Sequence, residues 1–225
     1  MDGETPIVSR ALWARGGKRC FDLILTVLLL VLLSPILLVA ALLVKLTSAG
    51  PVLFHQDRGG QSGTTFRLCK FRTMRAGRTP DAKELVPLDH PEITFAGRFL
   101  RRTKIDELPQ LFCVLAGDMS LVGPRPTLPD QIAAYDQFRR QRLLVRPGMT
   151  GLAQVNGNTA VPWDQRILFD IAYVRRCSLV LDIKIIARTF LVVLLGDRRM
   201  TRKFQETCHA AFVTIPDGYG QTDSE

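Results

Sequence analysis

The sequence predicts a mixed α/β fold that is rich in helices and carries one N-terminal membrane helix. Two observations support this class: residues 23–44 are almost uninterrupted apolar, and short strand-like segments precede longer stretches with helical spacing. With 225 residues, the chain can form one domain with a buried core and appendages. We divide it into four parts: an N-terminal arm (1–17), a membrane-embedded helix (18–47), a main domain (48–196) and a polar C-terminal tail (197–225).

The apolar segment is long enough, as a helix, to cross a hydrocarbon core of about 30 Å. Near its midpoint, Ser34-Pro35 interrupts the pattern, because proline lacks a backbone donor and disfavours helix at the preceding residue. Basic residues flank both ends, so the positive-inside tendency places both ends in the cytoplasm. A re-entrant helix satisfies both flanks if the serine hydroxyl or neighbouring groups satisfy the freed carbonyls. A kinked single span is the alternative.

Residues 52–55 and 65–74 predict two short strands, and the turn-rich residues 57–63 predict that they form a small β-hairpin. Alternation in the second strand places Lys70 and Arg72 on one face, where they could hold an anion. The alternative is that both are solvated charges at a sheet edge.

Three further segments predict helices. Residues 128–141 and 163–176 have helical spacing. The apolar residues 180–195 form either an interfacial amphipathic helix or an ordinary core helix.

The net charge of +9 predicts anionic partners, and nucleic acid, acidic lipid and phosphorylated metabolites all qualify. The few aromatic residues are not interleaved with the basic ones, as a stacking platform for single strands would require. A membrane-anchored basic nucleic-acid-binding or scaffold protein without catalysis is kept as the alternative function. The five cysteines are odd in number, widely spaced and free of any CxxC pair, which argues against a disulfide framework or a zinc site.

The adjacent acids Asp106-Glu107 are the most informative feature of the chain. Thr103 and Asp106 fit a capping box, but Pro109 better suits a helix that begins with Asp106 as its N-cap. The helix dipole and four nearby basic residues then predict a lowered pKa for Asp106. An ionised carboxylate of this kind is a feasible nucleophile toward phosphorus, because acyl phosphates form and break readily.

Two arginines downstream suit phosphate binding. Arg125 lies between Pro124 and Pro126, which restrict the backbone, and its planar fork matches phosphate oxygens. Arg146 precedes a predicted tight turn. Each arginine could instead satisfy nearby carbonyls.

Together these motifs resemble those of the bacterial sugar transferases, the monotopic phosphoglycosyl transferases that start polysaccharide or glycoconjugate assembly on polyprenyl phosphate. The resemblance runs from residue 18 to residue 195. Its motifs are Ser34-Pro35, residues 70–74 (KFRTM), 106–111 (DELPQL), 117–126 (GDMSLVGPRP), 146–157 (RPGMTGLAQVNG) and Asp170.

The resemblance implies a Mg²⁺-dependent, two-step transfer of a sugar phosphate from a UDP-sugar to undecaprenyl phosphate, with release of UMP. Asp106 would be the nucleophile that carries a covalent phosphosugar, and Glu107 would assist metal placement or proton removal, so both acids are expected at the metal. Asp170 matches an acidic position near the site. The basic positions implied to hold the phosphates are Lys70, Arg72, Arg98, Arg125 and Arg146.

The resemblance further implies a place in the bacterial inner membrane, with residues 48–196 as the catalytic domain on the cytoplasmic face. It favours the re-entrant form of the helix broken at Ser34-Pro35. Membrane lipid is an expected partner, nucleic acid is not, and a homodimer is left open. The implied role is the first membrane step of exopolysaccharide, capsule, O-antigen or glycoprotein glycan synthesis. The sequence departs from the family pattern at Thr64-Thr65, Cys113 and Asn158, and the departure at Asn158 bears on a contact to the sugar or the nucleotide. The sequence does not identify the sugar.

Overall fold

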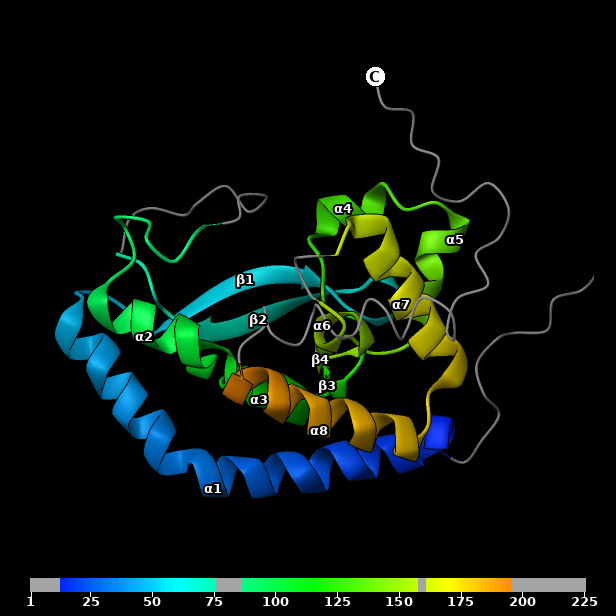
Figure 1. The fold of residues 1–225 in the computed structure, drawn as a ribbon, viewed down its shortest axis with the longest axis horizontal. Coiled ribbons are helices and arrows are strands. Elements are labelled where there is room, and N and C mark those ends of the chain that lie inside the picture. Colours follow the sequence, from blue (N-terminus) through cyan, green and yellow to red (C-terminus); the bar gives the residue numbers. More distant parts are fainter. Residues whose placement is uncertain (1–12, 76–85, 158–160, 196–225) are drawn as a thin grey trace, which may run out of the picture. The chain divides into compact units, whose positions relative to one another are not determined.

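The computed structural model describes residues 13–75, 86–157 and 161–195 (Figure 1). Most of the predicted arm and the whole predicted tail therefore lie outside the described residues. The chain divides into two compact units. Unit 2 contains residues 19–121 and 126–134, and unit 1 contains residues 1–18, 122–125 and 135–225. The helix-rich mixed α/β class is confirmed, with two small sheets among the described residues.

The predicted hairpin is confirmed in unit 2. Strands β1 (Leu53–Gly59) and β2 (Thr65–Phe71) pair antiparallel, with Leu53 opposite Phe71 and Gly59 opposite Thr65. A short 3₁₀ turn (Gln61–Gly63) joins them. The second strand is shorter than predicted, since it ends at Phe71 rather than at residue 74.

Helix α2 (Phe95–Thr103) follows the hairpin and begins with a side-chain cap. The Thr94 hydroxyl accepts a hydrogen bond from the Gly97 N–H at 2.9 Å, which satisfies one of the free donors of the first turn. A Cβ atom at Gly97 would lie 2.1 Å from the Thr73 carbonyl oxygen. Glycine is therefore what allows α2 to approach the chain just after β2 this closely.

The segment that carries the acid pair is a tight turn and not a helix start. Lys104 ends α2 in the left-handed conformation, with φ 59°, and Ile105–Glu107 forms a 3₁₀ turn. Helix α3 (Gln110–Ala116) then begins with Pro109 at its N-cap. The prediction that Asp106 is an N-cap is therefore wrong, because the chain reverses at Lys104 and makes a separate turn before α3.

Helix α1 (Lys18–Thr47) is the predicted membrane helix. It is the one described helix that is long and apolar enough, by length and composition, to cross a membrane. It continues through Pro35, and its axis changes direction near its middle (Figure 1). Pro35 cannot donate to the Val31 carbonyl, and the Ser34 hydroxyl donates to that oxygen instead, at 2.8 Å. The condition named for a re-entrant helix, that the serine or neighbouring groups satisfy the freed carbonyls, is thus met at the Val31 carbonyl.

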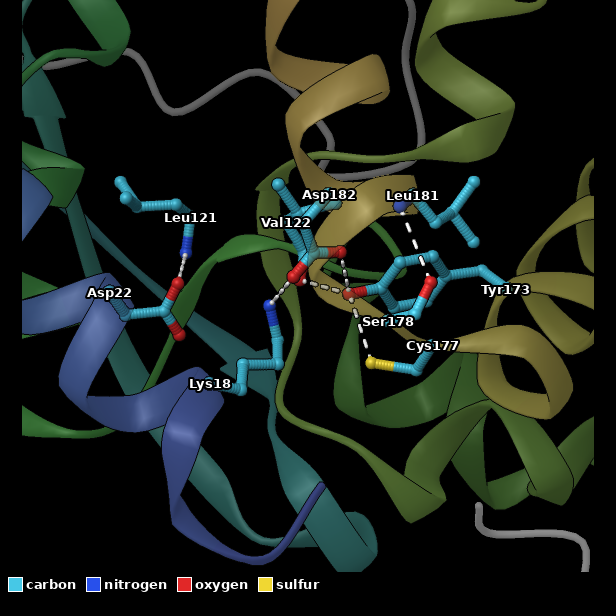
Figure 2. Close-up of polar contacts among 9 residues, drawn as sticks. All are labelled: Lys18, Asp22, Leu121, Val122, Tyr173, Cys177, Ser178, Leu181 and Asp182. Carbon is cyan, nitrogen blue, oxygen red and sulfur yellow. Dashed lines mark hydrogen bonds and ion pairs between the residues drawn. The ribbon is translucent and has the colours of Figure 1, made fainter. Parts of the chain in front are cut away.

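The first turns of α1 are tied to unit 2 by polar contacts. The Arg19 guanidinium donates to the carbonyls of Val114 and Leu115, at 2.6 and 3.0 Å, where α3 ends. The Asp22 carboxylate is buried and accepts a hydrogen bond from the Leu121 N–H at 3.3 Å (Figure 2). The Arg19 guanidinium thus supplies donors to carbonyls at the C-terminal end of α3, where intrahelical donors run out, and Asp22 supplies an acceptor to the start of β3.

The last turns of α1 are tied to the same unit by apolar contacts. Ala40 and Val44 are buried in one cluster with Phe71 of β2 and Leu100 of α2. Between the two attached ends, most apolar side chains of α1 are exposed. They include Ile24, Val27, Leu28, Val31, Leu32, Ile36, Leu38 and Val39.

Unit 1 contains most of the second sheet and the two longest C-terminal helices. Strands β3 (Ser120–Val122) and β4 (Gly148–Thr150) form this sheet, and β3 carries the chain into unit 1. The helices predicted over 163–176 and 180–195 are confirmed as α7 (Trp163–Arg176) and α8 (Leu179–Leu195). A short helix, α6 (Leu152–Val155), follows β4.

The helix predicted over residues 128–141 is wrong as one element. The chain there forms α4 (Pro129–Ala133), α5 (Gln137–Arg140) and a 3₁₀ turn (Gln141–Leu144). The interruption has a local cause: Asp136 adopts an extended backbone and its carboxylate accepts from the Arg139 N–H at 2.7 Å, so it caps a new helix.

A buried polar cluster joins α7 and α8 to the first residue of α1 (Figure 2). The Lys18 ammonium donates to the Asp182 carboxylate at 2.7 Å, and Asp182 is fully buried. The Tyr173 hydroxyl lies 2.8 Å from the same carboxylate and 2.9 Å from the Val122 carbonyl oxygen. The cluster thus provides a partner for a charge that would otherwise be costly to bury.

Candidate active site

Asp106 is buried in the 3₁₀ turn, with 8% of its surface exposed. Within the described part of the chain, its Oδ1 atom has no hydrogen-bond partner. Burial, followed by the adjacent Glu107 carboxylate, raises the pKa of Asp106 to about 6. The predicted lowering of this pKa is wrong, because desolvation of the carboxylate outweighs the attraction of Lys70, Arg101 and Lys104.

Lys70 lies close enough to the acid pair to interact with it electrostatically. It comes from β2, and its ammonium lies 5.2 Å from the centre of the Phe54 ring. Burial lowers the pKa of Lys70, while Asp106 and Glu107 act in the opposite direction. The structure thus brings together one predicted phosphate-binding lysine and the predicted catalytic acids.

Arg101 also faces the acid pair, although the sequence analysis did not place it in the site. Its Nε donates to the Thr73 hydroxyl at 2.9 Å and its Nη1 donates to the Val86 carbonyl at 3.3 Å. Burial lowers the pKa of Arg101, and Asp106 partly opposes this. A helical pattern through the buried Gly97 could have revealed it, because residue 101 lies one turn further on the same side.

Two other predicted phosphate-binding arginines of unit 2 have different surroundings. Arg72 is buried, and its guanidinium donates to the carbonyls of Ser48 and Ala49 at 2.7 and 2.6 Å, so it holds the chain that leaves α1. Arg98 lies on the exposed face of α2. Among the basic residues named for phosphate binding in this unit, Lys70 is the one that interacts with Asp106.

The remaining predicted residues, Arg125, Arg146 and Asp170, belong to unit 1. Asp170 is 2% exposed, and Arg142 donates to its Oδ2 at 2.5 Å. Burial raises the pKa of the Asp170 carboxyl, and the Arg142 charge opposes that change. This aspartate therefore lies in a buried ion pair through Oδ2, while its Oδ1 has no hydrogen-bond partner among the described residues.

Arg142 also supports the backbone of Arg125. Its guanidinium donates to the Arg125 carbonyl at 2.9 Å and to the Tyr135 hydroxyl at 2.6 Å. The side chain of Arg125 itself is exposed, and Arg146 is half-buried. The sequence analysis missed Arg142 because no local motif distinguishes it from the neighbouring arginines.

The acid pair could hold a divalent cation. Among the described residues, no group of three or more His, Cys, Asp or Glu side chains forms a complete protein metal site. Mg²⁺ does not require one, since it is commonly bound by one or two carboxylates together with substrate phosphates and water. The unpartnered Asp106 oxygen beside Glu107 fits that donor set.

Two buried cysteines lie next to these elements. The sulfur atoms of Cys69 and Cys113 are 3.6 Å apart, and Cys69 donates to the Pro109 carbonyl at 3.1 Å. All four cysteines in the described residues are free thiols. The fifth, Cys208, lies outside the described residues.

Comparison with known proteins identifies the family. Residues 13–196 match the bacterial sugar transferase family. The chain is 43% identical over 180 residues to the uncharacterized sugar transferase EpsL of Bacillus subtilis, covering 80% of this chain and 88% of that protein. The UDP-glucose:undecaprenyl-phosphate glucose-1-phosphate transferase of Escherichia coli is 42% identical over 190 residues, and the undecaprenyl-phosphate galactose phosphotransferase of Salmonella typhimurium is 40% identical over 200 residues.

The last two matches cover 80% and 82% of this chain but only 40% and 42% of those relatives. The chain thus spans about two-fifths of these two relatives, whose names state their substrates. Since the family match covers most of the chain, the chain belongs to the bacterial sugar transferase family. The predicted resemblance is confirmed.

Proposed function

We propose that this protein transfers a sugar phosphate from a UDP-sugar to undecaprenyl phosphate, giving a polyprenyl diphosphosugar and UMP. The observation that carries the proposal is Asp106, a buried carboxylate with an unpartnered oxygen and with Lys70 and Arg101 beside it. The names of the relatives support the substrate classes, since they include undecaprenyl phosphate as acceptor and, in one case, UDP-glucose as donor.

In the first step, an oxygen of Asp106 attacks the phosphorus that bears the sugar. A P–O bond to the carboxylate forms, the P–O bond to UMP breaks, and UMP leaves with the electron pair. In the second step, a phosphate oxygen of the lipid attacks the same phosphorus and the carboxylate leaves. Two readily reversible exchanges thereby replace one difficult transfer.

The surroundings of Asp106 suit this role. A carboxyl with a pKa of about 6 is mostly ionised at neutral pH, yet it lacks the full solvation of an exposed carboxylate. Lys70 and Arg101 supply positive charge where the phosphate groups must gather, which is the main requirement of phosphoryl transfer. At the start of a reaction cycle, these residues also stabilise the ionised carboxylate itself.

Glu107 and Asp106 are the residues that would hold Mg²⁺ together with the donor phosphates. When bound, the ion would neutralise phosphate charge and favour departure of UMP. Glu107 also raises the pKa of Asp106, so it keeps that carboxylate basic.

Arg125 and Arg146 of unit 1 are kept as proposed phosphate-binding residues. Arg125 has an exposed side chain on a backbone that Arg142 holds through the Arg125 carbonyl. Arg142 is held in turn by the buried Asp170. Asp170 would therefore act by positioning Arg125, and Arg146 would contribute a second guanidinium.

Helix α1 would be re-entrant, with both ends on the cytoplasmic face of the bacterial inner membrane. Its first turns bind α3 through Arg19 and its last turns pack against Leu100 of α2, so both ends attach to one folded unit. A helix of 30 residues is about 45 Å long if straight, and a straight span would separate its two ends by the bilayer. The hydrogen bond from Ser34 to the Val31 carbonyl supports a bend inside lipid, where an unsatisfied carbonyl is costly. α8, with exposed Val180, Ile183 and Phe190, would lie in the interface.

The proposed reaction is tested by product analysis. Purified full-length protein in lipid nanodiscs is incubated with undecaprenyl phosphate, Mg²⁺ and each of a panel of UDP-sugars. We expect at least one donor to give UMP together with a polyprenyl diphosphosugar. Release of UDP would instead indicate transfer of the sugar alone and would contradict the proposal, as would a lack of turnover with every donor.

The re-entrant topology predicts that both ends of α1 are labelled from the same side. The native Cys20, which is exposed at the start of α1, and a Ser62→Cys substitution at the tip of the hairpin are reacted separately with a membrane-impermeant maleimide in intact cells and in inverted membrane vesicles. Each position is tested as the sole exposed thiol in a chain that lacks Cys208. We expect both to react only in the inverted vesicles, and Leu32→Cys, in the middle of α1, to react in neither. Labelling of positions 20 and 62 from opposite sides would rule out the re-entrant helix.

A further inference from the structure

Two thiols meet inside unit 2, beside the candidate active site. Cys69 comes from β2 and Cys113 from α3, and 44 residues separate them in the sequence. Their sulfur atoms are in contact, at 3.6 Å. Cys69 is 8% exposed and Cys113 is 5% exposed, so neither residue is completely sealed from solvent. We call these two residues the thiol pair.

The geometry of the thiol pair is close to what a disulfide needs. A disulfide bond is about 2.05 Å long, so the two sulfur atoms must approach each other by about 1.5 Å. Rotation about the side-chain torsions and a small movement of α3 toward β2 can supply this approach, because the two elements already pack against each other. The thiol pair can therefore be cross-linked while unit 2 stays folded.

The two thiols differ in their surroundings. The hydrogen bond from the Cys69 thiol lowers the pKa of Cys113, and the Cys69 N–H acts in the same direction, while burial opposes both. The same contact between the side chains, followed by burial, raises the pKa of Cys69. Since the thiolate is the reactive form of cysteine, Cys113 is the thiol that reacts first and Cys69 is the one that then attacks it.

We propose that the thiol pair is a redox switch, in which a hydroperoxide converts the two thiols into a disulfide that slows transfer at Asp106. With hydrogen peroxide, the Cys113 thiolate attacks one peroxide oxygen, the O–O bond breaks, and a sulfenic acid and hydroxide form. The hydroxide takes up the proton that Cys113 had released. The Cys69 thiol then attacks the sulfenic sulfur, and water leaves as the S–S bond forms. Two thiols are thus oxidised while one peroxide is reduced to two waters.

The thiol pair lies between two parts of the candidate active site. Cys69 precedes Lys70 in β2, and its thiol donates to the carbonyl of Pro109, which follows Glu107 by two residues. A disulfide removes this donor and draws α3 toward β2, so Lys70 and the acid pair change their relative position. A displacement of about 1 Å can slow a reaction by roughly 100-fold. This effect rests on the function proposed above.

Reversibility suits the cytoplasmic face that is proposed for this domain. Disulfides in a reducing cytosol are usually transient, and many of them have a sensing role. Cellular thiols would reduce the bond by thiol–disulfide exchange and restore both cysteines. The switch would therefore slow the enzyme while peroxide is present and release it afterwards.

The test combines intact mass, peptide mapping and formation of the phosphosugar adduct. The full chain carries Cys20→Ser and Cys208→Ser, so that Cys69, Cys113 and Cys177 are its remaining thiols. It is treated with hydrogen peroxide in lipid nanodiscs, and the peroxide is removed before UDP-sugar and Mg²⁺ are added. The matched control adds Cys113→Ser, which keeps a hydrogen-bonding group but cannot form the disulfide. Cys177, which is buried, reports the oxidation of an ordinary buried thiol.

We expect the treated chain to lose the mass of two hydrogen atoms and to yield peptides linked through Cys69 and Cys113, while Cys177 remains a thiol. Adduct formation should slow by roughly 10- to 100-fold and recover with dithiothreitol. The Cys113→Ser chain should form the adduct at the same rate before and after peroxide. The proposal is overturned if the linked peptides are absent, if the linked protein reacts as fast as the reduced one, or if Cys113→Ser loses as much activity.

The reduced protein separates failure of the switch from failure of the proposed function. If the reduced chain forms the adduct but peroxide produces no disulfide, only the switch fails. If the reduced chain forms no adduct with any UDP-sugar, the proposed function fails, and the mass measurement still shows whether the disulfide forms. Amide hydrogen exchange of residues 105–112 then replaces the adduct as the readout, and exchange that cross-linking leaves unchanged would overturn the switch.

Discussion

Replacement of Asp106 with asparagine is expected to lower sugar-phosphate transfer by roughly 10⁴-fold or more, the scale seen when a catalytic nucleophile is removed. The reason is that an amide cannot form and release the acyl phosphate as a carboxylate does. Two measurements follow the loss: UMP release during turnover, and the intact mass of protein mixed with donor and Mg²⁺ alone. The wild type should gain the mass of a phosphosugar, and the variant should not.

The same substitution should stabilise the folded protein at neutral pH. The folded-state pKa of about 6 lies above the ordinary value of 3.8, so the ionised carboxylate is penalised by folding. The penalty at pH 7 is on the order of 3 kcal/mol, and Asp106→Asn removes it. Folding lowers the pKa of most aspartates, whereas here it raises the pKa. Wild-type stability should therefore approach that of the variant as the pH falls from about 6 toward 3.8. Thermal unfolding of both proteins across this range measures the difference.

The pH dependence of the adduct provides a further check. Formation of the phosphosugar adduct should fall as the pH decreases through about 6, because the protonated carboxyl is not a nucleophile. Glu107→Gln is the matched control, since it leaves the nucleophile in place and should still form the adduct, at a lower rate. An Asp106→Asn protein that retains wild-type turnover, or an adduct located on another side chain, would refute the assignment.

Replacement of Arg142 with methionine is expected to destabilise the protein by about 3–5 kcal/mol, the cost of leaving a buried charge without its partner. Asp170 would lose its ion pair, and the Arg125 carbonyl and the Tyr135 hydroxyl would each lose a donor. Unfolding by urea in detergent micelles measures the loss. Where folded protein remains, a weaker apparent affinity for the UDP-sugar would report the displaced Arg125.

Two further variants test whether the loss of stability in Arg142→Met comes from breaking a buried ion pair or from removing any arginine. Arg139→Met removes partly exposed ion pairs with Asp164, at 3.1 Å, and with Asp136, at 3.6 Å, and should cost less than about 1 kcal/mol. The double substitution Arg142→Met and Asp170→Leu removes both buried charges and should recover much of the loss. A double variant no more stable than Arg142→Met would contradict the account.

The sequence predicted those elements whose cause is local. Uninterrupted apolar residues predicted α1, and a glycine-rich turn between β-like segments predicted the hairpin. The spacing of apolar residues predicted α7 with its observed bounds. The break between α4 and α5 was missed, although Asp136 is itself a local signal for an N-cap.

The electrostatics of the site could not be predicted in the same way. The sign of the Asp106 pKa shift depends on burial, and burial results from packing between segments far apart in the sequence. Counting nearby basic residues gave the opposite sign. Arg98 and Arg101 are equivalent as letters in a motif, and only the position of the buried side of α2 distinguishes the residue that faces Asp106 from the one that faces outward.

Because of Gly97, the inner side of α2 tolerates fewer substitutions than the outer side. With the Thr73 carbonyl oxygen only 2.1 Å from where a Cβ would lie, any larger residue there must push the helix outward. Arg101 and the turn bearing Asp106 would move with it, away from the strand that carries Lys70. The absence of a side chain at position 97 thus sets the distance between Lys70 and the acid pair. Substitutions on the outer side of α2 leave that distance unchanged.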